Sequence, residues 1–135
     1  MNSKNDQIEK VESGKQGKNY LSQIYSEERR PISNYPQELA ELIINRNHVQ
    51  INANLLDVGC GRGDMLKAFK EKKLIVEGVD LSEESIKMLS PIKVHQKNLE
   101  TEIIDGREKY YDVIFSKSLI EHLNSPLKLF QNCKT

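Results

Sequence analysis

Three glycines and two acids lie where two apolar segments of the chain are expected to end. Gly59, Gly61 and Gly63 follow an apolar segment that ends at Asp57, and Asp80 ends the next apolar segment. Glycine adopts positive φ angles and leaves room for a ligand to lie against the backbone. A carboxylate at the tip of a strand can accept hydrogen bonds from both hydroxyls of a ribose. The pattern therefore predicts a strand–loop–helix unit that binds a nucleoside.

The spacing of these glycines narrows the ligand class. Dinucleotide-binding loops follow the pattern G-x-G-x-x-G and place a pyrophosphate at the start of the next helix. Here the pattern is G-x-G-x-G, and Asp64 follows it directly. A carboxylate at the start of that helix would repel a pyrophosphate and would tolerate or attract a ligand with a positive centre.

Apolar strands and amphipathic helices alternate along the chain around these residues. This alternation predicts an α/β fold with a parallel sheet and right-handed crossovers. The carboxyl ends of parallel strands share one edge of a sheet, so that edge should collect the glycine loop and both acids. We expect strands at residues 54–58, 74–79, 92–96 and 112–116, helices at 36–46, 64–72, 82–90 and from 126 onward, and a helical turn at 119–123.

Single residues within these elements carry local expectations. Leu66 and Phe69 should face the core, because they lie on the apolar face of their helix. Ser82 should cap the helix that follows it. The third strand alternates apolar and polar residues, which is typical of a half-exposed edge strand. We therefore expect His95 at the surface, as well as His48.

The composition fits one globular domain. The chain has 135 residues, 37% of them hydrophobic and 30% charged, and its formal net charge is zero. A neutral balance does not favour a nucleic-acid partner, because binding a phosphate backbone requires clustered Lys and Arg. No apolar run reaches the roughly 20 residues of a membrane span, and the N-terminus lacks the apolar core of a signal peptide. We expect no membrane partner and a cytoplasmic protein whose Cys60 and Cys133 stay reduced.

The chain divides into a polar N-terminal segment and one domain. Residues 1–18 are polar, rich in lysine and without periodicity, so we expect disorder there, and residues 19–135 should form the domain. Tyr20, Tyr25 and Arg30 fit two interpretations equally well. They could form a lid over the substrate, or the aromatic rings could cover the core beside a surface arginine.

Four segments occur in a characteristic order: Asp57–Gly63, Val76–Asp80, Tyr111–Ser116 and Leu119–Leu123. Together they resemble the motifs of the class I S-adenosylmethionine-dependent methyltransferases, of the type-11, ubiquinone-pathway-like kind. The resemblance covers roughly residues 37–130. It implies a Rossmann-like parallel sheet with the strand order 3-2-1-4. It also implies S-adenosylmethionine as the cofactor and methyl transfer to a small-molecule acceptor as the function.

The resemblance implies a role for the loop and the two acids. Asp57 would hold the ammonium group of the ligand, directly or through water, and the alternative is a carboxylate that only braces loop amides. Asp80 would accept hydrogen bonds from the ribose, and the alternative is an acid that caps the next helix. Cys60 is small and should fill the loop rather than act as a nucleophile. The ligand would approach the backbone at Gly59, Cys60, Gly61 and Gly63.

Further residues complete the expected cofactor site. Leu81 would lie against the adenine, although a core leucine fits the position nearly as well. Asn98, with Leu99 beside it, would accept a hydrogen bond from the adenine amino group through its side-chain oxygen, where many relatives carry Asp. The backbone carbonyl of Ser116 would accept a hydrogen bond from the ammonium group of the ligand.

Glu121 and His122 also fit two interpretations. His122 could act as a general base for a hydroxyl substrate, because the ordinary pKa of histidine lies near 7. The alternative is a structural Glu-His pair at the end of a helix. Some relatives bind a divalent metal here with Glu-x-x-Glu-His, but Ser118 stands in place of the first carboxylate, so we expect no metal.

The residues after the fourth strand bear on the methyl acceptor. Enzymes that methylate nucleobase amino groups usually carry Asn/Asp-Pro-Pro-aromatic there, whereas this chain reads Ser116-Lys117-Ser118-Leu119. We therefore expect a small metabolite, sugar or lipid-pathway intermediate. Two rival functions remain open. One is a non-catalytic adenosyl-ligand module that needs a partner or a missing half, and the other is a nucleotide-binding oxidoreductase domain, which the glycine spacing disfavours.

Members of this family usually continue with a fifth strand and a final antiparallel hairpin. The residues after Ser116 suffice for one helix and for no further strand. The apolar strand Val113–Phe115 would then lie at a sheet edge, where it could pair with another chain. Three explanations compete: a fragment of a larger domain, a partner that completes the sheet, or a degenerate remnant. We favour the fragment, and we expect self-association through this edge.

Overall fold

Residues 33–134 are described by a computed structural model. The chain divides into two units, Met1–Ser33 and Asn34–Thr135, and the fold below is that of the second. Two expectations concern residues outside the described part of the chain. They are the disorder of residues 1–18 and the candidate lid formed by Tyr20, Tyr25 and Arg30.

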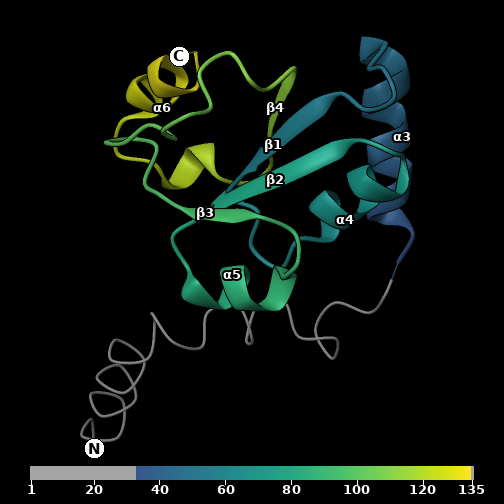
Figure 1. Ribbon diagram of the computed structural model, residues 1–135, viewed down its shortest axis with the longest axis horizontal. Coiled ribbons are helices and arrows are strands. Elements are labelled where there is room, and N and C mark those ends of the chain that lie inside the picture. Colours follow the sequence, from purple (N-terminus) through teal and green to yellow (C-terminus); the bar gives the residue numbers. More distant parts are fainter. Residues whose placement is uncertain (1–32, 135) are drawn as a thin grey trace, which may run out of the picture. The chain divides into compact units, whose positions relative to one another are not determined.

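The sheet is built from four strands: β1 (Asn54–Val58), β2 (Ile75–Asp80), β3 (Val94–Gln96) and β4 (Val113–Ser116). All of them are parallel, and they lie in the order β3-β2-β1-β4 (Figure 1). The α/β class and the strand order expected from the sequence are therefore confirmed. Because β1 and β2 are the central strands, the two acids at their ends lie in the middle of the carboxyl edge.

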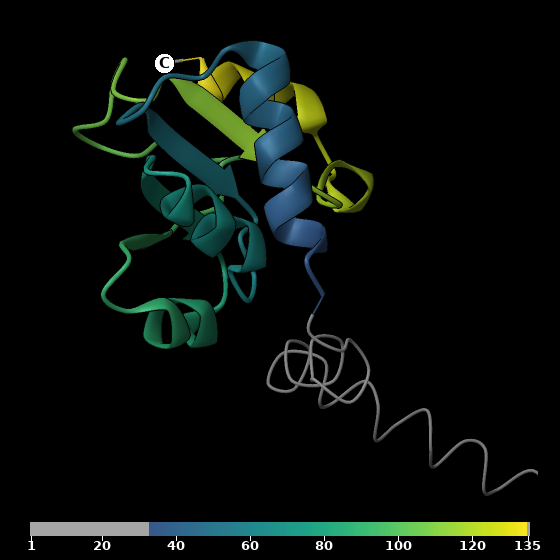
Figure 2. The ribbon, with the colours of Figure 1, turned by 90° about the vertical axis from the view of Figure 1, so that its right-hand side faces the viewer.

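Helices cover both faces of the sheet. They are α3 (Tyr35–Asn47), α4 (Asp64–Glu71), α5 (Glu83–Leu89) and α6 (Pro126–Cys133), with a 3-10 turn, η1 (Ile120–His122), before the last of them. Each falls within a few residues of its expected position. Helix α3 lies on one face of the sheet and α6 on the other (Figure 2).

Alternate residues of β1 supply two cores, because successive side chains of a strand point to opposite faces. Leu55 belongs to the cluster beneath α3 and α4, and Leu56 and Val58 belong to the cluster on the α6 side. Leu66 and Phe69 of α4 are fully buried, as expected. The Phe69 ring meets Phe115 of β4 edge to face, with ring centres 5.2 Å apart, which fastens α4 to the edge of the sheet.

Helix α3 reaches the carboxyl edge with its N-terminal end. Its last residue lies shortly before β1, so the helix ends near the start of that strand and begins at the opposite edge (Figure 2). A contact agrees with this direction: Nζ of Lys117, just after β4, lies 4.7 Å from the centre of the Tyr35 ring. The start of α3 therefore lies beside the residues that follow β4.

Two local expectations need correction. His95 is not a surface residue: only 13% of its side chain is exposed, and its Nε2 lies 2.8 Å from Oε2 of Glu77, which shares its face of the sheet. Ser82 does occupy the N-cap of α5, but its side chain makes no capping hydrogen bond. Instead, its backbone N–H donates to Oδ1 of Asp80 at 2.9 Å. His48 is exposed, as expected.

Candidate functional site

The glycine loop is fixed by backbone hydrogen bonds at the carboxyl edge. The amides of Gly59 and Cys60 both donate to the carbonyl of Val79 in β2, at 2.8 and 3.1 Å. The glycines Gly59, Gly61 and Gly63 have φ angles of 75°, 53° and 82°. These left-handed conformations favour glycine, so the alternation of glycines predicted the shape of this loop correctly.

Asp80 connects the loop to the start of α5. Its Oδ2 accepts from the Gly61 N–H at 2.9 Å, and its Oδ1 accepts from the Ser82 N–H at the same distance. From the other side, the buried hydroxyl of Ser85 donates to the Gly61 carbonyl at 2.7 Å. The carboxylate is thus held in one orientation. Each oxygen retains acceptor capacity, because a carboxylate offers about four lone-pair sites.

Asp57 is a buried acid at the end of β1. Only 3% of its surface is exposed. Burial, and then the negative charge of Asp80, raise the pKa of Asp57 to about 7. Within residues 33–134, no group donates a hydrogen bond to its side chain. A buried carboxylate without a donor is costly in its charged form, so this position favours a positively charged partner.

A pocket of about 460 Å³, including its open mouth, lies beside these acids. Five of the expected site residues line it: Gly59, Asp80, Leu81, Asn98 and Leu99. The other expected residues do not appear in its wall: Asp57, Cys60, Gly61, Gly63, Ser116 and His122. Six further residues of the wall were not expected from the sequence. All of them are apolar except Lys97; they are Val58, Val79, Lys97, Leu119, Leu123 and Leu129.

The expected adenine side of this pocket has a polar and an apolar residue. Asn98 Oδ1 accepts from the Glu100 N–H at 3.0 Å, which orients the amide and leaves the oxygen one further lone pair. Leu81 is 65% exposed and lines the pocket, so its side chain lies open to a ligand instead of filling the core. Both residues can therefore take the roles expected of them.

The residues after β4 adjoin the same pocket. Ser116 donates its hydroxyl to the Val58 carbonyl at 3.2 Å, which holds the end of β4 against β1. Glu121 and His122 are exposed and 3.8 Å apart, and they lie in η1 between two leucines that line the pocket. Neither side chain is fixed by burial, so the catalytic role of His122 stays a prediction. In residues 33–134, no three His, Cys, Asp or Glu side chains gather as metal ligands would.

Two loop residues face the protein rather than the pocket. Cys60 is 8% exposed, and burial raises the pKa of its thiol far above the ordinary range. Its Sγ would lie 2.7 Å from a Cβ placed on Gly78, so the thiol fills the space beneath the loop, as expected. A Cβ on Gly63 would lie 2.2 Å from Cδ2 of Leu89. The room that Gly63 leaves is therefore occupied by Leu89.

Gly63→Ala should lower the free energy of unfolding by about 1–3 kcal/mol, because the new Cβ combines backbone strain with a clash in the core. Gly106→Ala is the matched control. Gly106 also has a positive φ, of 73°, but a Cβ there meets nothing within 4 Å. Urea unfolding of both variants measures the difference, and equal losses would show that Leu89 moves aside without cost.

Gln37 was not singled out by sequence reasoning. It lies in the first turn of α3, and its Oε1 is buried and has no hydrogen-bond partner within residues 33–134. Because α3 begins at the carboxyl edge, this acceptor is at the same edge as the glycine loop. A glutamine in an amphipathic helix carries no signal of such a position.

Comparison with known proteins places this geometry in a family. The sequence model of the methyltransferase domain family matches residues 20–135 of this chain. A ubiquinone biosynthesis O-methyltransferase of Coxiella burnetii (strain RSA 493 / Nine Mile phase I) is 30% identical over 86 residues, which cover 59% of this chain and 37% of that protein. The chain thus spans well under half the length of this curated relative.

Solved structures share the fold. A SAM-dependent methyltransferase from Archaeoglobus fulgidus is 26% identical with a TM-score of 0.60, covering 82% of this chain and 51% of that one. Coclaurine N-methyltransferase, solved with N-methylheliamine and SAH, is 21% identical with a TM-score of 0.62, covering 73% and 30% of the two chains. In the described part of this chain, no helix is long and apolar enough to cross a membrane.

Proposed function

Because this chain belongs to the methyltransferase domain family, we propose that it binds S-adenosylmethionine and takes part in transferring the methyl group to a small-molecule acceptor. The names of its relatives and the SAH in a related structure support the ligand class. The observation that carries the proposal is Asp57, a buried carboxylate without a hydrogen-bond donor in residues 33–134, next to a loop that a nucleoside can approach.

The residues of the carboxyl edge fit the parts of this ligand. Asp57 holds the ammonium group directly or through water, and Asp80 accepts hydrogen bonds from the ribose hydroxyls. Asn98 accepts from the adenine amino group, and Leu81 lies against the ring. The bound cofactor supplies a methyl carbon that its sulfonium makes electrophilic. What the protein contributes is orientation of the reactants and exclusion of water, which the apolar wall of the pocket favours.

The acceptor lies beyond Ser116, on the side of the pocket where η1 and the start of α3 meet the carboxyl edge. His122 takes a proton from an acceptor that must lose one. The neutral net charge supports a small molecule over a nucleic acid. Cys60 and Cys133 are both unpaired, which fits a cytoplasmic protein.

Calorimetry tests the proposal. The chain should bind S-adenosylhomocysteine (SAH) and should not bind NAD, because Asp64 stands where a pyrophosphate would lie. Binding of NAD alone would favour the oxidoreductase interpretation and would refute the proposal. A methyl-transfer assay on the 135-residue chain then separates an active enzyme from a non-catalytic binding module. Only the active enzyme releases SAH when acceptors are supplied.

We also propose that residues 19–135 are the cofactor-binding half of a larger domain and that the edge of β4, which no strand of residues 33–134 covers, pairs with further polypeptide. Ile114 of β4 is 40% exposed, and Leu127 and Phe130 of α6 are 67% and 54% exposed. Apolar surface of this kind beside a strand edge favours association. The positions of the residues that hold the cofactor would not depend on this association.

The 135-residue chain should therefore self-associate, and its melting temperature should rise with protein concentration. Ile114→Lys should weaken the association, because it puts a charge on the exposed face of the edge strand. Size-exclusion chromatography and melting curves at several concentrations measure both effects. A concentration-independent monomer that melts above roughly 60 °C would show that the short domain needs no partner.

A further inference from the structure

Glu77 gathers three hydrogen-bond donors in a buried position of β2. Only 7% of the residue is exposed. His95 Nε2 lies 2.8 Å from Oε2, and Arg107 approaches with Nη2 at 2.9 Å from Oε1 and with Nε at 3.2 Å from Oε2. The Tyr111 hydroxyl donates to Oε2 as well. Three polar side chains that lie 18 or more positions further along the chain thus meet on one carboxylate.

The partners of Glu77 lie on either side of a single segment. His95 belongs to β3, which ends just before residue 97, whereas Arg107 and Tyr111 follow residue 106. Residues 97–106 form neither a strand nor a helix. Both ends of this segment are therefore fastened to the same carboxylate. Closing a segment in this way restricts the conformations that it can adopt.

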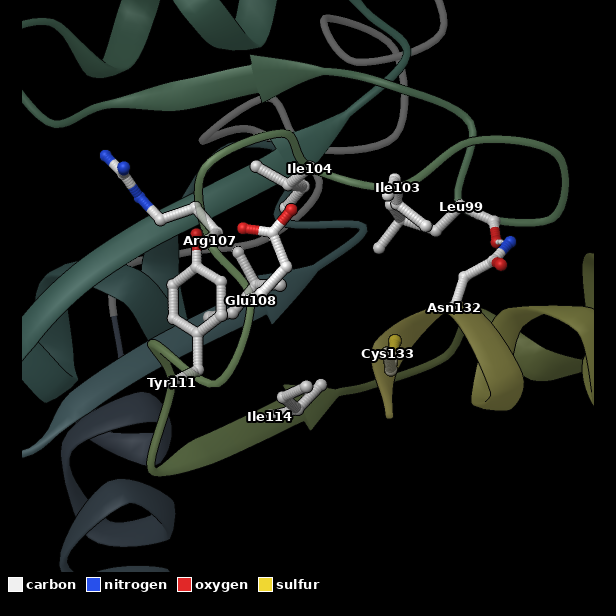
Figure 3. Close-up of a pocket in the computed structure, with 10 residues that line it drawn as sticks. Leu99, Ile103, Ile104, Arg107, Glu108, Tyr111, Ile114, Asn132 and Cys133 are labelled. Atoms are coloured by element: carbon white, nitrogen blue, oxygen red, sulfur yellow. Dashed lines mark hydrogen bonds between the residues drawn. The ribbon is translucent and has the colours of Figure 1, made fainter. Parts of the chain in front are cut away.

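The segment forms one wall of the cofactor pocket through Lys97, Asn98 and Leu99. Behind this wall lies a second pocket of about 350 Å³, including its open mouth, which Leu99 also lines (Figure 3). Asn132 of α6 donates to the Leu99 carbonyl at 2.6 Å across one side of it. Because an open pocket lies behind the wall, side-chain packing supports the wall only in part. Polar contacts therefore share in holding it: Asn132 and the Ser125 N–H, which donates to Oε1 of Glu100 at 3.0 Å, hold its middle, and the partners of Glu77 hold its two ends.

We propose that Glu77 is a positioning residue for the adenine side of the cofactor, because it fixes the segment that carries Asn98 and Leu99. The inference rests on the function proposed above. Although burial raises the pKa of Glu77, hydrogen bonds from Arg107, Tyr111 and His95 outweigh it and lower the pKa to about 2. The carboxylate is thus ionised at neutral pH, and its hydrogen bonds are of the strong, charge-assisted kind.

Glu77→Gln tests the proposal, because it keeps the size of the side chain and removes its charge. The matched control is Glu108→Gln, at an exposed residue of the same region. Two ligands are titrated by calorimetry: SAH and S-inosylhomocysteine, in which a carbonyl replaces the amino group of the adenine. Wild type and Glu108→Gln should prefer SAH by at least tenfold, and Glu77→Gln should lose most of this preference.

If Glu77 had a merely structural role, Glu77→Gln would lower the affinity for both ligands equally and leave the preference for SAH intact. That result would overturn the proposal. Hydrogen exchange of the amides of residues 97–106 gives a second readout. It should be faster in Glu77→Gln than in Glu108→Gln, and unchanged exchange would refute the positioning role even if no ligand binds. Tyr111→Phe removes a single donor and should shift both readouts in the same direction, so it serves if Glu77→Gln fails to fold. Wild type that binds no SAH would instead refute the proposed function.

Discussion

Asp80→Ala should lower the affinity for SAH at least thirtyfold, about 2 kcal/mol. A charge-assisted acceptor for two hydroxyls contributes on the order of 1.5–3 kcal/mol. The structure adds a second cause. Asp80 also accepts from the amides of Gly61 and Ser82, so its removal frees the glycine loop from the start of α5.

Two comparisons separate these causes. Asp64→Ala, at the other acid of the loop, should leave the affinity nearly unchanged, because Asp64 pairs with Arg62 at 3.2 Å. A 2′,3′-dideoxy analogue of SAH removes the hydroxyls from the ligand instead. Wild type should bind the analogue more weakly than SAH, and Asp80→Ala should discriminate less between the two. Equal discrimination by both proteins would show that Asp80 only braces the loop.

The arrangement of the strands could be predicted because local and distant signals agree along most of the chain. Each apolar strand is followed by an amphipathic helix, and the glycine loop identifies which strand lies at the centre. Gly59, Gly61 and Gly63 all have the positive φ angles that their spacing indicated. Asp80 and Asn98 line one pocket although they are 18 positions apart, since Asp80 ends β2 and Asn98 follows β3, the parallel neighbour of β2.

Side-chain pairing across the sheet could not be predicted in the same way. The alternation in β3 assigns His95 to a face, but it does not reveal that Glu77 lies on the same face or that Arg107 and Tyr111 cover both. Those residues are far apart in the sequence and meet only through the path of residues 97–112. Gly63 shows the same limit, since its neighbour Leu89 belongs to another helix. A sequence pattern predicts the backbone conformation of a residue. Which other residues contact it depends on the tertiary fold.

Asp57 links the stability of the domain to the proposed ligand. A group whose pKa is raised on folding holds its proton more tightly in the folded state, so stability falls as the pH rises above the ordinary pKa of 3.8 and levels off above about 7. A shift from 3.8 to about 7 corresponds to roughly 4 kcal/mol, at about 1.4 kcal/mol for each unit of pKa. An ammonium group beside Asp57 would offset this cost, and it would do so only in the bound state.

Asp57→Asn should therefore be more stable than wild type by roughly 4 kcal/mol at pH 8 in the absence of ligand, and the difference should vanish near pH 4. Urea unfolding at both pH values measures it. The same variant should bind SAH at least tenfold more weakly, because the ammonium group loses its counter-charge.

Calorimetry near pH 7 in buffers of different ionisation enthalpy adds a direct test of this coupling. Wild type should release protons on binding SAH, since the ammonium group favours the charged carboxylate, and Asp57→Asn should release fewer. A variant that is less stable than wild type at pH 8 would mean that Asp57 braces the loop in its charged form. The ligand's ammonium group would then have to be held elsewhere. The Ser116 carbonyl and the buried side-chain oxygen of Gln37 are the next candidate acceptors.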